Sequence, residues 1–335
     1  MLKLLKKGVE NMYNYYIINL INNLLTLTIA SYISYVLPLT IYTNIFDTVY
    51  NKFKVKRLKK SGYIISGNIP TPPKIDEPEL KKEIAKLVIP YVEKLKDHLD
   101  ENNLNNLYRN LKTLRITDQN KFENLFYAGL YNSQTNTIKL DTKKNALGHE
   151  LLHLASSYYD KKTNINYVGF KQGQGKTQIG AGLNEGYTEL LNERIFPKNN
   201  RKNPYKNETK IAKLFEFFFD DKKEMENYYF NNNLPGFIHH MEQFAPRQEI
   251  INLILDVDRI NETTMDFTNP LPTFLSIKTQ LKLYDWYENS CPNKQKLRAF
   301  KNEICKSTLV EIALSGKKAI LTKPKTLQTQ AAYSR

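Results

Sequence analysis

Residues 146–155 read ALGHELLHLA, a short apolar segment that carries two histidines and one glutamate. His149 and His153 are four residues apart, so in a helix both imidazoles leave one face, one turn above the other. That spacing lets two ring nitrogens reach the same metal ion at about 2.0–2.1 Å. The leucines and alanines around them predict that this helix is buried, where an unpaired His-Glu-His cluster would be costly. We expect the helix to be capped by Asp141-Thr142 and to run to about Tyr158.

Glu150 follows the first histidine, and a second acidic pair lies further along the chain. Residues 182–189 read GLNEGYTE, so Glu185 and Glu189 share one face of another expected helix, 182–195. Glu185 is a candidate third metal ligand. Glu189 could accept a hydrogen bond from the second nitrogen of a ligating histidine.

The pair HELLH and GLNEGYTE resembles the two motifs of the thermolysin-like gluzincin zinc metallopeptidases, and the chain looks like a divergent bacterial member. The resemblance runs from the hairpin before the first motif through the helix of the second. It implies one Zn²⁺ per chain, bound by His149, His153 and Glu185, with Glu189 as a support behind a ligand. It also implies hydrolysis of a peptide or protein substrate by a zinc-activated water, with Glu150 as the general base.

The expected fold class is α+β and mostly helical. We expect a zincin-like core with a small β-hairpin or sheet above the HExxH helix, followed by a helical C-terminal half. Four regions are expected: an N-terminal membrane anchor with a basic flank (1–60), a linker and helical segment (61–115), the metallopeptidase domain (116–313) and a basic tail (314–335). Residues 159–180, rich in Gly, Lys and Gln, are expected to form a flexible loop near the cleft.

Two β-prone runs precede the first motif and predict a hairpin, 127–131 and 136–140. In zincins an edge strand above the metal helix pairs with an extended substrate by β-augmentation. Our candidate for this substrate strand is Asn136-Thr137-Ile138-Lys139-Leu140, with a plain structural strand as the alternative.

Transition-state stabilisation requires a hydrogen-bond donor near the developing oxyanion. Gluzincins often use a His or Tyr from the C-terminal half, and His239 and His240 are the first candidates here. The other available groups are Tyr187, Tyr228 and Tyr229.

Residues 11–46 contain no charged side chain, and 24–42 are about long enough to cross a bilayer. We therefore expect a membrane anchor at 24–42, with a buried or amphipathic helix as the alternative. Lysines and one arginine crowd residues 52–60, so the positive-inside rule predicts that the catalytic domain faces the cytoplasm. Without a spanning helix, we expect a cytoplasmic protein.

The net charge of +15 raises the question of a nucleic-acid partner. Most of the 49 basic residues are lysines, which an AT-rich genome favours, and arginine is scarce. The chain also lacks a zinc-finger or RNP-type motif, so we expect no nucleic-acid partner. The two cysteines, Cys291 and Cys305, belong to no Cys/His cluster, so we expect them not to bind metal.

Two alternatives to the gluzincin hypothesis stay open. One is a zincin of another branch, of the type that cleaves transcriptional repressors. The other is a non-catalytic zinc-binding protein associated with a membrane, although such a site would have no use for the base Glu150.

Overall fold

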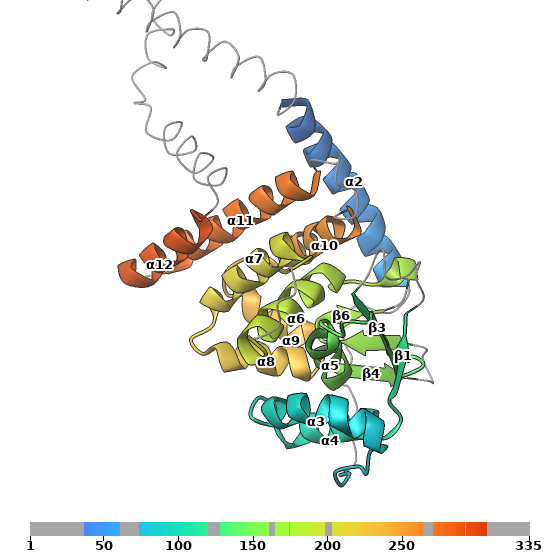
Figure 1. Ribbon diagram of the computed structural model, residues 1–335. Coiled ribbons are helices and arrows are strands. Elements are labelled where there is room, and N and C mark those ends of the chain that lie inside the picture. Colours follow the sequence, from blue (N-terminus) through green and yellow to red (C-terminus); the bar gives the residue numbers. More distant parts are fainter. Residues whose placement is uncertain are drawn as a thin grey trace, which may run out of the picture. The chain divides into compact units, whose positions relative to one another are not determined.

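The computed structural model describes residues 37–60, 74–119, 128–160, 165–173, 175–197, 203–263, 271–291 and 293–306. Its contacts divide the chain into two units, Met1–Arg57 and Leu58–Arg335. The second unit combines many helices with two small sheets, which confirms the expected mostly helical α+β class (Figure 1). The expected tail 314–335 lies outside the described residues.

The prediction of a membrane-spanning helix is wrong. Across the part of the chain that the structure describes, no helix combines the length and the apolar character needed to cross a bilayer. Residues 24–36 of the expected span lie outside that part, and the remainder enters α2 (Leu37–Lys60). The apolar run does not continue through α2, because its second half carries the basic residues of 52–60. The prediction that the catalytic domain faces the cytoplasmic side of a membrane depended on this span, so it no longer has support.

The second unit begins with two helices, α3 (Lys82–Lys96) and α4 (Glu101–Lys112). The carboxylate of Asp100 caps α4 by accepting the Asn103 N–H at 2.8 Å. One face of α4 is buried, and this helix packs directly on the HExxH helix, α5 (Leu147–Ala155).

The first sheet has the strand order β1-β3-β2, with β1 (Arg115–Asp118), β2 (Gly129–Asn132) and β3 (Thr137–Leu140). β3 pairs with β1 in parallel and with β2 antiparallel. The expected hairpin is therefore present, but the expected substrate strand, Asn136 to Leu140, lies in the centre of the sheet. Its backbone groups already bond to a strand on each side, so it cannot pair with a substrate. The reason is the non-local strand β1, which hairpin signals do not reveal.

A second sheet replaces the flexible loop expected at 159–180. It contains β4 (Ser157–Asp160), β5 (Ile165–Val168) and β6 (Lys171–Gln172) as an antiparallel meander. A short 3₁₀ turn, η3 (Gly175–Thr177), and a bridge between Gln172 and Ile179 lead into the next helix. Gly169, with φ 54°, lies in the turn between β5 and β6, and glycine is a residue that also suggests a loop from composition alone.

The C-terminal half is helical, as expected. Its elements are α6 (Ala181–Ile195), α7 (Lys206–Phe215), η4 (Glu216–Phe218), α8 (Lys222–Phe230), α9 (Leu234–Met241), α10 (Arg247–Thr263), α11 (Leu271–Ser290) and α12 (Lys294–Ile304). α6 packs against α5, α7 and α10 and is buried along nearly its whole length. Tyr187 of α6 belongs to a cluster of fully buried aromatic residues that pack edge to face or tilted: Phe170, Tyr187, Tyr229 and Phe237. The two cysteines are free.

Candidate metal centre

The HExxH helix α5 (Leu147–Ala155) is shorter than expected at both ends. Every one of its residues is buried. Asp141 does not cap it: its carboxylate instead accepts the Lys144 N–H at 2.8 Å in a local turn, and the helix begins only after Ala146. At the other end the chain leaves the helix after Ala155 and enters β4 at Ser157.

Two asparagines of α4 satisfy the carbonyl groups at the end of α5. Asn106 Nδ2 donates to the carbonyls of Ala155 and Ser157 at 3.0 and 3.1 Å. Asn110 Nδ2, one turn further along α4, donates to the carbonyls of Leu154 and Ser157 at 2.8 and 3.0 Å. The last carbonyls of a helix have no partner inside the helix, and burying them unpaired would be costly. α4 therefore makes it possible for α5 to end inside the core.

The second motif lies on α6, whose N-terminus is fixed by α10. Gly180 adopts a left-handed conformation with φ 81°, which glycine tolerates, and it turns the chain from η3 into α6. The Asp258 carboxylate of α10 accepts the N–H groups of Gly180 and Gly182 at 2.9 and 2.8 Å. A negative charge at this end of a helix also interacts favourably with the helix dipole.

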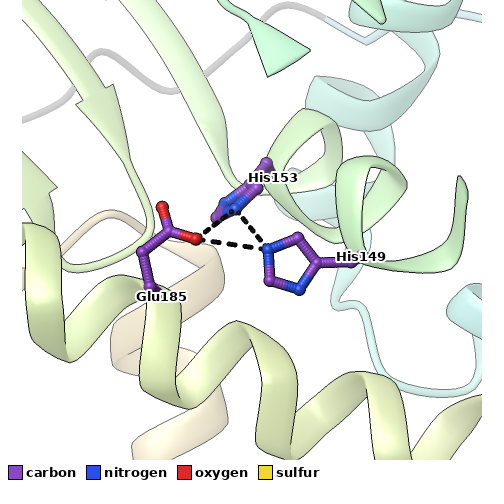
Figure 2. A group of neighbouring side chains, drawn as sticks. All are labelled: His149, His153 and Glu185. Atoms are coloured by element: carbon purple, nitrogen blue, oxygen red, sulfur yellow. Dashed lines mark hydrogen bonds and ion pairs between the residues drawn. The ribbon is translucent and has the colours of Figure 1, made fainter. Parts of the chain in front are cut away.

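α5 and α6 bring His149, His153 and Glu185 together, with their polar atoms pointing towards one another (Figure 2). The two histidine Nε2 atoms lie 3.0 Å apart. Glu185 Oε2 lies 3.2 Å from Nε2 of His149 and 3.3 Å from Nε2 of His153. The histidine side chains are 2% and 8% exposed, whereas Glu185 keeps 20% of its side chain exposed. The cluster is thus buried on the side of α5 and reaches the surface at Glu185.

These distances fit three ligands of a single ion. Ligands at about 2.0–2.1 Å from a tetrahedral zinc are separated by about 3.3 Å, close to the separations observed here. Two imidazoles and one carboxylate are also a donor set that zinc accepts, and they leave a fourth position open. The residues present therefore fit the metal that the resemblance implies.

Hydrogen bonds behind the histidines orient both rings. Glu189 Oε2 accepts from Nδ1 of His149 at 2.8 Å, so the Nε2 of that ring faces the cluster. Behind His153, the Asn184 side-chain amide lies 3.3 Å and Thr188 Oγ1 lies 3.5 Å from Nδ1 of the ring. Thr188 Oγ1 also donates to the Asn184 carbonyl at 2.7 Å and contacts the Tyr229 hydroxyl at 2.7 Å. Outer groups of this kind fix the ring orientation of metal-binding histidines.

The charges of the cluster are strongly coupled. Burial by itself would lower the pKa of His149, but hydrogen bonds to Glu185 and Glu189 and the nearby charge of Glu150 raise it to about 9. Burial likewise opposes ionisation of Glu185, yet His153 and His149 hold the pKa of this carboxyl well below its usual range. Without a metal, the surrounding carboxylates therefore favour the protonated form of His149.

Tyr205 also contacts the cluster and was missed by the sequence analysis. Its ring stacks on His149 with 5.6 Å between centroids and 14° between planes. Its backbone is fixed, because its N–H donates to Asn203 Oδ1 at 2.7 Å and its carbonyl accepts the Thr209 N–H at 2.8 Å. Tyr205 precedes α7, outside both motifs, and no local pattern identifies it.

The structure places both candidate oxyanion histidines in other contacts. Nε2 of His240 lies 2.9 Å from the Phe218 carbonyl, Nδ1 lies 3.2 Å from Glu224, and the ring stacks on Phe219. Both of its nitrogens are thus engaged, one by η4 and the other by α8. His239 is 82% exposed and pairs with Glu242. Neither histidine joins the metal cluster.

The three tyrosine candidates are also placed away from this role. Tyr229 contacts Thr188 behind His153, and Tyr187 is fully buried in the aromatic core. Tyr228 packs beside His240 and Phe219. They contribute to the core and the support of the site.

Comparison of the chain with protein-family models, with curated proteins and with solved structures gave no match.

Proposed function

We propose that this protein is a zinc-dependent peptidase of the gluzincin type with a zincin-like core. The observation that carries the proposal is the convergence of His149, His153 and Glu185 from two helices, at separations suited to one ion. Glu150 lies on the same helix as the histidines and is 4% exposed. A purely structural zinc site has no use for such a buried carboxylate beside its ligands.

A few residues of the site have defined parts in this proposed reaction. When bound, a zinc ion supplies Lewis acidity that polarises a peptide carbonyl and makes a water acidic enough to lose its proton near neutral pH. Glu150 takes that proton and passes it to the leaving amine. Glu189 keeps the ring of His149, and Asn184 and Thr188 keep the ring of His153, in the orientation that ligation requires.

We assign β2, rather than the central strand β3, as the strand that pairs with an extended substrate. It pairs with β3 on one side only among the described residues, and it packs on α5. The Asp141 N–H donates to the Ala128 carbonyl at 3.1 Å, so the antiparallel alternation directs the peptide groups of Leu130 towards β3. Those of Gly129 and Tyr131 are directed outwards, where an extended peptide could pair with them.

The test uses the purified full-length chain, metal analysis and a peptide library. We expect about one zinc per chain, and cleavage that falls by about 10²–10⁴-fold in Glu150→Gln while zinc is retained. His153→Ala is the matched control, in which both zinc and cleavage are lost. A wild-type chain without zinc would refute the proposal. A chain that binds zinc and cleaves nothing would support the non-catalytic alternative.

A repressor-cleaving zincin would be distinguished by substrate. It would cleave a folded repressor protein and leave the short peptides of the library intact. The proposed enzyme cleaves the peptides themselves, because an extended segment is what an edge strand binds.

A further inference from the structure

Gly129 lies so close to α5 that no side chain fits there. A Cβ at this position would lie 2.6 Å from the Cβ of Ala146, 2.8 Å from Oε1 of Glu150 and 3.0 Å from Cγ of Glu150. No left-handed conformation is recorded at Gly129, in contrast to Gly169 or Gly180. Space, and not backbone conformation, is therefore what requires a glycine in β2.

The space that a side chain at 129 would fill is taken by the side chain of Glu150. Glu150 is buried and its carboxylate lies against the strand, so the backbone of β2 forms one wall of the region that this side chain can occupy. A long, flexible glutamate loses conformations when one side of it is walled off. Fewer conformations remain in which the carboxylate can point away from the cluster.

We propose, on the basis of the proposed peptidase function, that Gly129 is a positioning residue: it holds the side chain of the general base Glu150 in the conformation that the reaction requires. The absent side chain lets the edge strand approach the base to van der Waals distance. The same strand then performs two tasks: its outer edge pairs with the peptide, and its inner face fixes the carboxylate. The distance between substrate backbone and base is thereby set by one residue.

The test must separate the effect on Glu150 from a general loss of fold. Gly129→Ala alone would also collide with Ala146, whose Cβ cannot rotate away. The double variant Gly129→Ala/Ala146→Gly removes that collision and retains the one with Glu150. Ala146→Gly alone is the control, since glycine is acceptable at a helix N-cap, and it should match wild type in thermal stability, metal content and cleavage.

We expect a loss of catalytic rate that comes from the displaced Glu150 alone, with substrate and metal binding unchanged. With a casein probe, kcat of the double variant falls about 10- to 100-fold, because a small displacement of a catalytic group is sufficient for that loss. KM and zinc affinity stay within about twofold of wild type, because neither the substrate strand's outer edge nor the ligands are altered. The second readout needs no substrate: in the Co²⁺-loaded protein, the pH transition of the visible spectrum moves from the wild-type value towards the value found for Glu150→Gln.

Other results would overturn the proposal. A double variant with wild-type kcat and an unmoved Co²⁺ transition shows that the position of Glu150 does not depend on Gly129. A variant that loses metal or unfolds while Ala146→Gly is normal shows that Gly129 serves packing alone. If the wild-type chain binds neither Zn²⁺ nor Co²⁺, the proposed function itself fails, and the inference fails with it.

Discussion

The ring of His149 is restrained from three directions. Glu189 accepts from its Nδ1, Glu185 and His153 face its Nε2, and Tyr205 covers one face of the ring. An imidazole held in this way has little freedom to turn its Nε2 away from a metal. The affinity of the site should therefore depend on residues that never touch the ion.

Proton competition at His149 predicts the pH dependence of zinc binding. Its pKa is raised from 6.5 to about 9, so the metal-free ring is protonated at neutral pH and zinc must displace that proton. The pKa of Glu185 is lowered, so Glu185 is already ionised there. Zinc affinity should rise about tenfold per pH unit between pH 6 and 8, measured by chelator competition. An affinity that stays constant over this range would contradict the raised pKa.

Replacement of Tyr205 tests the stacking contact. An aromatic pair contributes about 0.5–1.5 kcal/mol beyond its buried area, so Tyr205→Ala should weaken zinc binding about two- to tenfold. Tyr205→Phe keeps the ring and should bind zinc like wild type. Tyr158→Ala removes a tyrosine whose ring packs on Tyr167, and it serves as the control. Equal zinc affinity in all four proteins would show that the stack does not support His149.

At the scale of elements, both motif helices depend on partners distant in sequence. α5 is ended by asparagines of α4, and α6 is started by an aspartate of α10. Each helix terminus has polar backbone groups that its own residues do not satisfy. The geometry of the metal cluster therefore rests on two caps supplied by neighbouring helices.

Asp258→Ala should destabilise the protein and weaken the site together. Loss of the cap leaves two N–H groups without their acceptor and is expected to cost about 2–3 kcal/mol in the free energy of unfolding. Zinc affinity should fall as well, because α6 carries Glu185 and Glu189. Denaturant unfolding and chelator competition measure the two effects.

Asp221→Ala provides the comparison for that experiment. Asp221 caps α8 by accepting the Lys223 N–H at 2.9 Å in an exposed position. Its loss should lower stability by about 0.5–1 kcal/mol and leave zinc affinity unchanged. If both variants affect zinc equally, the Asp258 cap has no special role at the site.

For the second unit as a whole, the candidate site joins two parts with different surroundings. α5 contacts the first sheet and α4, whereas α6 contacts α7 and α10 of the helical half (Figure 1). An ion bound by both helices would link these parts and stabilise the folded state only.

Zinc removal should therefore lower the melting temperature. At a free zinc concentration 1,000-fold above Kd, binding adds about 4 kcal/mol, which corresponds to about 10 °C for a domain of this size. Calorimetry with and without a chelator measures the shift. His153→Ala should melt at the same temperature in both conditions, and a chelator effect on that variant would point to another metal site.

The features that could be predicted from sequence are local ones. The spacing of His149 and His153, the shared face of Glu185 and Glu189, the hairpin and the helical C-terminal half all follow from periods of a few residues. The expected membrane span was not such a feature: the uncharged residues fit the length rule, but α2, which the end of this stretch enters, is basic in its second half.

The sequence by itself determined which side chains can leave one helix face together, because that depends only on the pitch of the helix. The tertiary structure alone decided which strand lies at the edge, where α5 and α6 begin and end, and that Tyr205 and Gly129 reach the site. Those features depend on contacts between residues far apart in the chain, such as Asp258 with Gly180 or Gly129 with Glu150. No local pattern encodes such contacts, because they arise only when separate elements pack and satisfy one another's unpaired groups.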